Sequence, residues 1–147
     1  MAHMIEMKKV SKFYSGNGTV STGFSKVDLN FDLGEFVVVT GESGGGKSTL
    51  LNVISGLDSY EEGEMFVAGK DTGGFRTEDY EEYRKKYIGN IFQDYNLINS
   101  YTVYQNVELA LILNGYNNRN KKKLIKDIIK WVGLEKYEKT RVSKLSG

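Results

Sequence analysis

A glycine-rich loop between a predicted strand and a predicted helix constrains the fold of this chain more than any other feature. The segment 41–48 reads Gly-Glu-Ser-Gly-Gly-Gly-Lys-Ser and satisfies the pattern G-x-x-x-x-G-K-[ST]. Before the loop, the continuous β-branched and aromatic run 36–39 predicts a short strand buried on both faces of a parallel sheet. After the loop, the apolar spacing within 48–55 predicts a helix that ends at Gly56. A strand, a glycine loop and a helix in this order predict an α/β fold.

The residue types in this loop suit the binding of a nucleotide's phosphates. Glycines let backbone amides curl toward an anion, and the start of the following helix adds its positive dipole end. Lys47 can neutralise the β- and γ-phosphates, Ser48 offers a hydroxyl ligand for Mg²⁺, and Thr49 can donate to the α-phosphate. A turn that merely joins a strand to a helix does not require lysine and serine at this spacing. We therefore predict a phosphate-binding site made by Gly41, Glu42, Ser43, Gly44, Gly45, Gly46, Lys47, Ser48 and Thr49.

The rest of the chain predicts antiparallel strands followed by helices. Alternating apolar and polar residues at 5–14 and 27–33, separated by a loop at 15–18, predict an antiparallel pair of strands. Further strands are predicted at 64–68 and, as a second buried strand, at 87–92. Thr77 is predicted to head a helix with acidic residues in its first turn and basic residues in its last. Two helices follow, one opened by a capping box of Thr102 and Gln105 and one with an apolar face within 124–132.

Composition and charge exclude several classes of function. The 20 basic and 19 acidic side chains leave a formal net charge of +1, so no overall field favours nucleic acid as a partner. The chain has no cysteine and a single histidine, which excludes disulfides and a zinc site. The basic run within 119–130 is interpreted as the solvated face of a helix, against the alternative of a lipid or nucleic-acid patch. Residues 1–4 are interpreted as an expression scar.

Three stretches in this order resemble the ATP-binding subunits of ABC transporters. The first is the phosphate loop continued by Leu50-Leu51, with Gly56-Leu57 and Gly63-Glu64 after it. The second is Ile91-Phe92-Gln93, which resembles the family's glutamine loop, with Asn96-Leu97, Thr102-Val103 and Asn106-Val107 after it. The third is Leu145-Ser146-Gly147, which resembles the first three residues of the family's signature sequence. The segments 56–58 and 106–111 are most similar to the lipoprotein-release, macrolide and antimicrobial-peptide export group.

The resemblance implies a P-loop NTPase fold of the ABC ATPase type, with an N-terminal antiparallel β part, an incomplete parallel-sheet core and a helical subdomain. Its boundaries would be 5–93 for the nucleotide-binding core and 94–147 for the helical subdomain. ATP and Mg²⁺ are the implied cofactors. Tyr14 stands where the family stacks an aromatic ring on adenine, whereas an ordinary packing role in an edge strand is the alternative. Gln93, with Lys47, would act in catalysis, and Gln93 would share Mg²⁺ with Ser48.

The resemblance also implies partners and a location. Residues 94–106 would contact a transmembrane permease subunit, and Leu145, Ser146 and Gly147 would face a second ATPase subunit. The protein would be cytoplasmic and peripheral at the inner face of the membrane.

The family's catalytic glutamate and histidine follow its signature sequence, and neither segment is found here. We therefore expect ATP binding to survive better than turnover in this chain, and unpaired strand edges to favour self-association. A non-hydrolysing nucleotide-binding or assembly module is the alternative. A chromosome-maintenance ATPase is less favoured because no heptads precede the signature. A small-molecule kinase leaves the signature-like residues unexplained.

Overall fold

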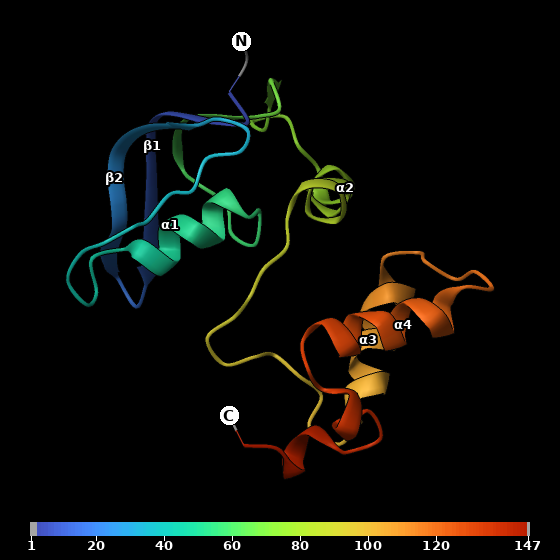
Figure 1. Ribbon diagram of the computed structural model, residues 1–147. Coiled ribbons are helices and arrows are strands. Elements are labelled where there is room, and N and C mark those ends of the chain that lie inside the picture. Colours follow the sequence, from blue (N-terminus) through green and yellow to red (C-terminus); the bar gives the residue numbers. More distant parts are fainter. Residues whose placement is uncertain (1–2, 147) are drawn as a thin grey trace. The chain divides into compact units, whose positions relative to one another are not determined.

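The computed structural model describes residues 3–146, which form two compact units divided in the sequence between Asn90 and Ile91. Each unit has an apolar core of its own. In Figure 1 the first unit carries the blue and green elements, and the second carries the orange and red helices.

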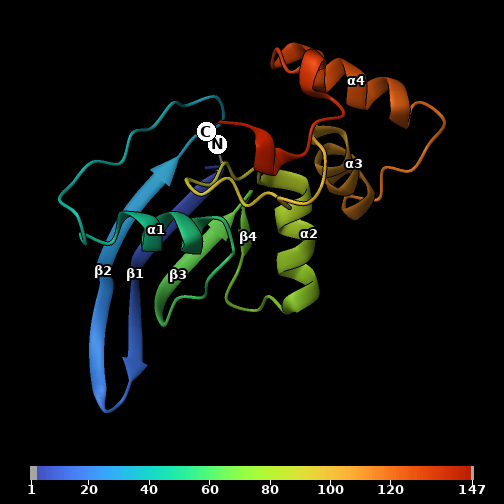
Figure 2. The same ribbon diagram turned by 90° about the horizontal axis from the view of Figure 1, so that it is seen from below.

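The first unit is built on an antiparallel sheet with the strand order β2-β1-β3-β4 (Figure 2). The strands are β1 (Ile5–Gly16), β2 (Thr19–Phe31), β3 (Glu62–Val67) and β4 (Lys70–Asp71). Asn17 and Gly18 both have positive φ, at 51° and 77°, which is the tight turn that suits the twist of an antiparallel hairpin. The predicted pairing of the first two strands is confirmed, although β2 begins at Thr19 rather than at residue 27.

Two helices complete the first unit, α1 (Lys47–Ile54) and α2 (Thr77–Tyr87). The predicted helix stop is confirmed, because Gly56 adopts a φ of 68° and its amide donates to the carbonyl of Val53. Helix α2 begins at Thr77, but the capping position is Arg76, whose amide donates to the Asp79 carboxylate at 2.8 Å. Side chains from both helices pack on β1 and β3 in a core of Met7, Val10, Val53, Ile54, Met65, Val67 and Tyr83.

Neither of the two predicted buried strands forms. Residues 36–39 have no regular structure and the Phe36 side chain is 93% exposed, whereas Tyr87 ends α2 and Ile91 is 101% exposed. A strand exists only where a neighbouring strand takes up its backbone hydrogen bonds. Every strand pair within residues 3–146 is antiparallel, so this part of the chain supplies neither segment with a parallel partner.

The second unit is helical, as predicted, with α3 (Val103–Leu113), α4 (Lys121–Trp131) and the short 3-10 helices η1 (Glu135–Tyr137) and η2 (Val142–Lys144). The capping box ahead of α3 is confirmed: the Gln105 amide donates to the Thr102 hydroxyl, and the Thr102 amide donates to the Gln105 side chain. The core of this unit consists of Val103, Ile125 and Ile129, with Leu145 packed against it.

Tyr83 sets an alkaline limit to the stability of the first unit. The side chain is 3% exposed and its hydroxyl donates to the Ile54 carbonyl. Burial, and then the neighbouring Tyr80, raise the pKa of Tyr83 to about 12. The pKa of tyrosine in an unfolded chain is about 10. Because the fold disfavours the phenolate, this contribution to stability is complete below about pH 10 and is lost as the pH rises through about 12.

We expect Tyr83→Phe, which cannot ionise, to lose less stability than the wild type between neutral pH and pH 12. The measurement is the free energy of unfolding from denaturant titrations across that range. Tyr137→Phe is the matched control, because Tyr137 is half-exposed in the second unit and should follow the wild-type curve. Identical pH profiles for Tyr83→Phe and the wild type would contradict this account.

Candidate functional site

The glycine loop has a curled backbone that only glycine adopts without strain. Gly44 and Gly46 have φ values of 79° and 80°, in the left-handed region. The Gly45 amide donates to the Glu42 carbonyl at 3.1 Å, which closes a turn within the loop. Helix α1 begins directly afterwards at Lys47, and the Leu50 amide donates to the Gly46 carbonyl at 2.8 Å as the first helical hydrogen bond. The loop therefore leads into a helix N-terminus, where an anion is favoured.

The Lys47 ammonium is held against the loop that precedes it. Its Nζ donates to the Gly41 carbonyl at 2.9 Å and also to the Glu42 carbonyl. These carbonyls keep the positive charge at the mouth of the loop, next to the amides that would face a phosphate.

Strand β2 braces the loop through a backbone contact that leaves no room for a side chain. A Cβ placed on Gly46 would meet the Gly23 carbonyl oxygen at 2.1 Å, and a Cβ on Gly23 would meet the Thr49 methyl carbon at 2.8 Å. Glycine is therefore required at position 46, where the clash is with backbone, whereas a side chain at position 23 would crowd the Thr49 side chain. Gly23 is not among the residues predicted from the sequence; its signal is a glycine inside a strand, which often marks a close backbone approach.

A hollow of about 420 Å³ lies between the loop and the sheet, within the size range of small-ligand sites. The structure brings Tyr14 of β1 to this hollow together with most of the predicted loop residues, and adds two residues of β2. The lining residues are Tyr14, Thr22, Gly23, Ser43, Gly44, Gly45, Gly46, Lys47, Ser48 and Thr49. The amides, ammonium group, hydroxyls and aromatic ring in this lining fit a triphosphate joined to a planar base.

Tyr14 contacts two charged residues, Lys12 and Asp58, that were not predicted from the sequence. Its hydroxyl donates to Asp58 Oδ2 at 2.9 Å, and the Lys12 ammonium lies 4.9 Å from the centre of its ring. Lys12 also pairs with Asp58 Oδ1 at 2.9 Å and with Glu61 Oε1 at 3.1 Å. Lys12 stands two residues before Tyr14, which puts both side chains on one face of β1.

The ion pairs keep Lys12 and Asp58 charged. Burial alone would lower the pKa of Lys12, but hydrogen bonds and charge from Asp58 and Glu61 outweigh it and raise the pKa above its usual value. Burial would likewise raise the pKa of Asp58, but hydrogen bonds from Lys12, Tyr14 and the Ser59 amide lower it overall. Both groups are therefore ionised at neutral pH.

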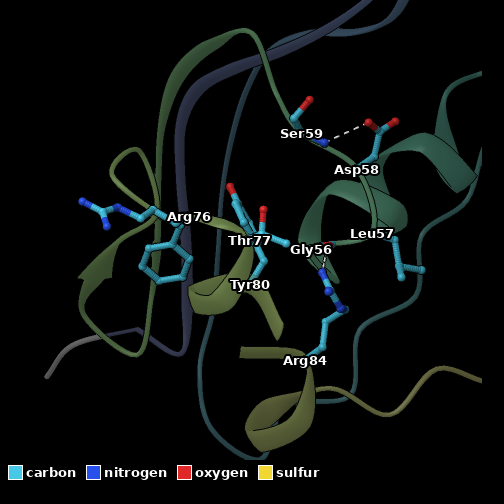
Figure 3. A pocket seen from close by; sticks show the side chains of 9 residues that line it. Gly56, Leu57, Asp58, Ser59, Arg76, Thr77, Tyr80 and Arg84 are labelled. Carbon is cyan, nitrogen blue, oxygen red and sulfur yellow. Dashed lines mark hydrogen bonds between the residues drawn. The ribbon is translucent and has the colours of Figure 1, made fainter. Parts of the chain in front are cut away.

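The turn that carries Asp58 borders a second hollow of about 500 Å³, drawn in Figure 3. Arg84 of α2 donates to the Gly56 carbonyl at 2.6 Å, and the Ser59 amide donates to Asp58 Oδ1 at 2.8 Å. These bonds fix the end of α1 and the turn after it. The hollow is lined by Gly56, Leu57, Asp58, Ser59, Phe75, Arg76, Thr77, Tyr80 and Arg84.

The remaining predicted site residues belong to the second unit. Gln93 begins an exposed turn at 93–96 of the second unit, whereas Ser48 lies in the first unit. Leu145 packs into the second core and Ser146 is exposed, whereas Gly147 lies outside the described residues. An apolar hollow of about 620 Å³ in this unit is lined by Tyr95, Leu97, Asn99, Val103, Asn106, Val107, Leu134, Val142, Ser143, Leu145 and Ser146.

Two negative findings apply to the described range 3–146. No group of three or more His, Cys, Asp or Glu side chains is placed to hold a metal ion there. In the same range, no helix combines the length and the apolar character needed to span a bilayer.

Comparison with known proteins identifies a family for this chain. The family model described as ABC transporter matches residues 24–147. A methionine import ATP-binding protein of Clostridium acetobutylicum is 40% identical over 98% of this chain and 43% of its own length. A macrolide export ATP-binding/permease protein of Mannheimia succiniciproducens is 34% identical over 99% of this chain and 23% of its own length.

A solved structure agrees with the fold described above. The ATP-binding cassette MJ0796, in a dimeric post-hydrolysis state bound to ADP and Pi, is 33% identical with a TM-score of 0.88. The alignment covers 97% of this chain and 63% of that one. The chain thus spans less than two thirds of the length of each of these relatives.

The contact between Gly46 and Gly23 can be tested by its effect on stability. Gly46→Ala adds a Cβ both to a left-handed residue and against a carbonyl oxygen, whereas Gly44→Ala adds one at a similar φ with nothing within 4 Å. Overpacking of this kind costs about 1–3 kcal/mol. We therefore expect Gly46→Ala to lower the free energy of unfolding of the first unit by about that amount more than Gly44→Ala does. Equal losses in urea titrations without nucleotide would contradict a braced loop.

Proposed function

The chain belongs to the ABC transporter family of ATP-binding proteins, and from this premise we propose that it binds Mg-ATP in the hollow beside the glycine loop. One observation carries the proposal: a helix N-terminus, a confined ammonium group and an aromatic ring line the same space. The bound ADP and Pi of the MJ0796 cassette support it by family.

The loop residues, Tyr14 and Gln93 each have a role in this proposal. The amides of 43–48 and the Lys47 ammonium bind the β- and γ-phosphates, and the Thr49 hydroxyl donates to the α-phosphate. Tyr14 stacks on the adenine base through one face of its ring. Ser48 would supply an oxygen ligand to Mg²⁺, a hard cation that prefers oxygen, and the family resemblance assigns a second such ligand to Gln93. Bound Mg²⁺ would neutralise charge on the phosphates during transfer to water.

We propose further that the chain acts as part of a transport ATPase with partners at two places. Leu145, Ser146 and Gly147 would face a second ATPase subunit, in keeping with the dimeric state of the MJ0796 cassette. Residues 94–106 would receive a cytoplasmic helix of a transmembrane permease subunit. The apolar hollow of the second unit supports this surface, because 94–106 contributes Tyr95, Leu97, Asn99, Val103 and Asn106 to its lining. The protein would then lie at the cytoplasmic face of a membrane.

The finer placement in the lipoprotein-release, macrolide and antimicrobial-peptide export group also remains a proposal. The macrolide export relative supports it, whereas the methionine import relative, at higher identity, supports a different direction of transport.

Replacement of the loop lysine tests nucleotide binding directly. Lys47→Ala removes the ammonium group from the loop while every backbone amide remains, and a charge-assisted hydrogen bond is worth about 1.5–3 kcal/mol. We expect the affinity for Mg-ATP, measured by calorimetry, to fall by a factor of about 10–100. Lys70→Ala is the matched control, because Lys70 is exposed on β4 and does not line the hollow. Unchanged affinity in Lys47→Ala would remove the basis of the proposal.

Turnover separates a transport ATPase from a non-hydrolysing module. The family's catalytic glutamate positions the attacking water, and this chain holds no matching segment. We expect the 147-residue chain to bind Mg-ATP but to release phosphate slowly, and a longer chain that adds the family's glutamate and histidine segments to release it much faster. Full phosphate release by the 147-residue chain would refute this assignment, and none by the longer chain would favour the non-hydrolysing module.

A further inference from the structure

We propose that Lys12 and Asp58 are positioning residues that fix the Tyr14 ring for stacking on the base of the bound nucleotide. This inference rests on the proposed function of the hollow. It adds a role for the charged contacts of Lys12 and Asp58 with the Tyr14 ring, which phosphate binding does not require.

Lys12 is the unusual residue of this group. Its side chain is 5% exposed, and lysine is rarely buried to this extent unless it is paired. Asp58 and Glu61 satisfy it through ion pairs, and Ser59 accepts a weaker hydrogen bond at 3.4 Å. Lys12 does not line the hollow, so its charge is directed at the ring and the carboxylates rather than at a phosphate.

The contacts of Tyr14 restrict its ring in two ways. The ammonium of Lys12 lies over one face, 4.9 Å from the ring centre, and the hydroxyl is tied to Asp58 at the ring's far end. A cation over a ring face is attracted to it, and the hydrogen bond prevents the ring from swinging about its χ1 torsion. Because Tyr14 lines the hollow and Lys12 does not, we take the face away from Lys12 as the one that a base would contact. A ring that is already fixed loses less conformational entropy when the base binds.

Asp58 lies in a turn after α1 that is fixed by hydrogen bonds of its own. Figure 3 shows the bond from the Ser59 amide to its carboxylate and the bond from Arg84 to the Gly56 carbonyl. The Tyr83 hydroxyl binds the Ile54 carbonyl one turn earlier. The turn after α1 is thus anchored by α2, and the Tyr14 ring is located by β1 at one end and by this turn at the other.

The test compares a ligand that has a base with one that has none. Lys12→Met keeps the length of the side chain and removes the charge. In the full chain we expect it to weaken Mg-ATP binding by about threefold to tenfold and to leave Mg-tripolyphosphate binding within about twofold of wild type. Lys12→Arg, which retains a cation, is expected to recover most of the loss. Lys8→Met is the matched control, since Lys8 lies on the same strand, 5.0 Å from the Phe66 ring centre and 3.0 Å from Glu6, away from the hollow.

Equal weakening of the binding of both ligands by Lys12→Met would show a merely structural role and overturn the inference. No effect on the binding of either ligand would also overturn it.

Lys12→Met is also combined with Tyr14→Leu, and the loss of affinity due to Lys12→Met should vanish in that background because no ring remains to be positioned. If Lys12→Met does not fold, Tyr14→Phe decides: it keeps the stacking face and loses the bond to Asp58, so it should weaken Mg-ATP but not Mg-tripolyphosphate. An unaltered ratio of the two affinities in Tyr14→Phe would then overturn the inference. Lys47→Ala tests the proposed function separately, because a phosphate site at the loop predicts that this variant binds both Mg-ATP and Mg-tripolyphosphate more weakly. If Lys47→Ala weakens both ligands but Lys12→Met has no selective effect, only the inference about Lys12 fails.

Discussion

The close approach of β2 to the glycine loop is the contact on which the rest of the site depends. The Gly23 carbonyl occupies the place where any other residue at position 46 would carry its Cβ. This contact fixes the first residues of α1 against the sheet, so that the helix N-terminus and the Tyr14 ring border one hollow. Without it, a loop with the right sequence would still lack a wall against which a ligand could be enclosed.

The first unit therefore contains a packed core and an apolar segment that lies outside that core. The antiparallel sheet, α1 and α2 share one core that closes on itself through Met7, Val53 and Tyr83. The apolar run before the loop does not join that core, and Phe36 and Val38 remain exposed. Exposed apolar side chains next to a structured loop are a surface that burial by further protein would stabilise.

Features that depend on neighbours in the sequence could be predicted. The capping box at Thr102, the helix stop at Gly56 and the glycine loop each follow from the local preferences of a few residues. The strands at 36–39 and 87–92 could not, because apolar character alone does not supply the neighbouring strand that a parallel sheet requires. The contacts of Lys12 could not either, since its carboxylate partners lie more than forty residues away, after the helix. The assignment of Tyr14 to the site came from family resemblance rather than from any local signal.

The segment in front of the loop has a consequence for ligand binding. Residues 36–40 belong to no helix or strand, so helix α1 adjoins the loop on one side and no regular element adjoins it on the other. A triphosphate that engages the loop amides would therefore add contacts next to a segment that lacks a regular element of its own.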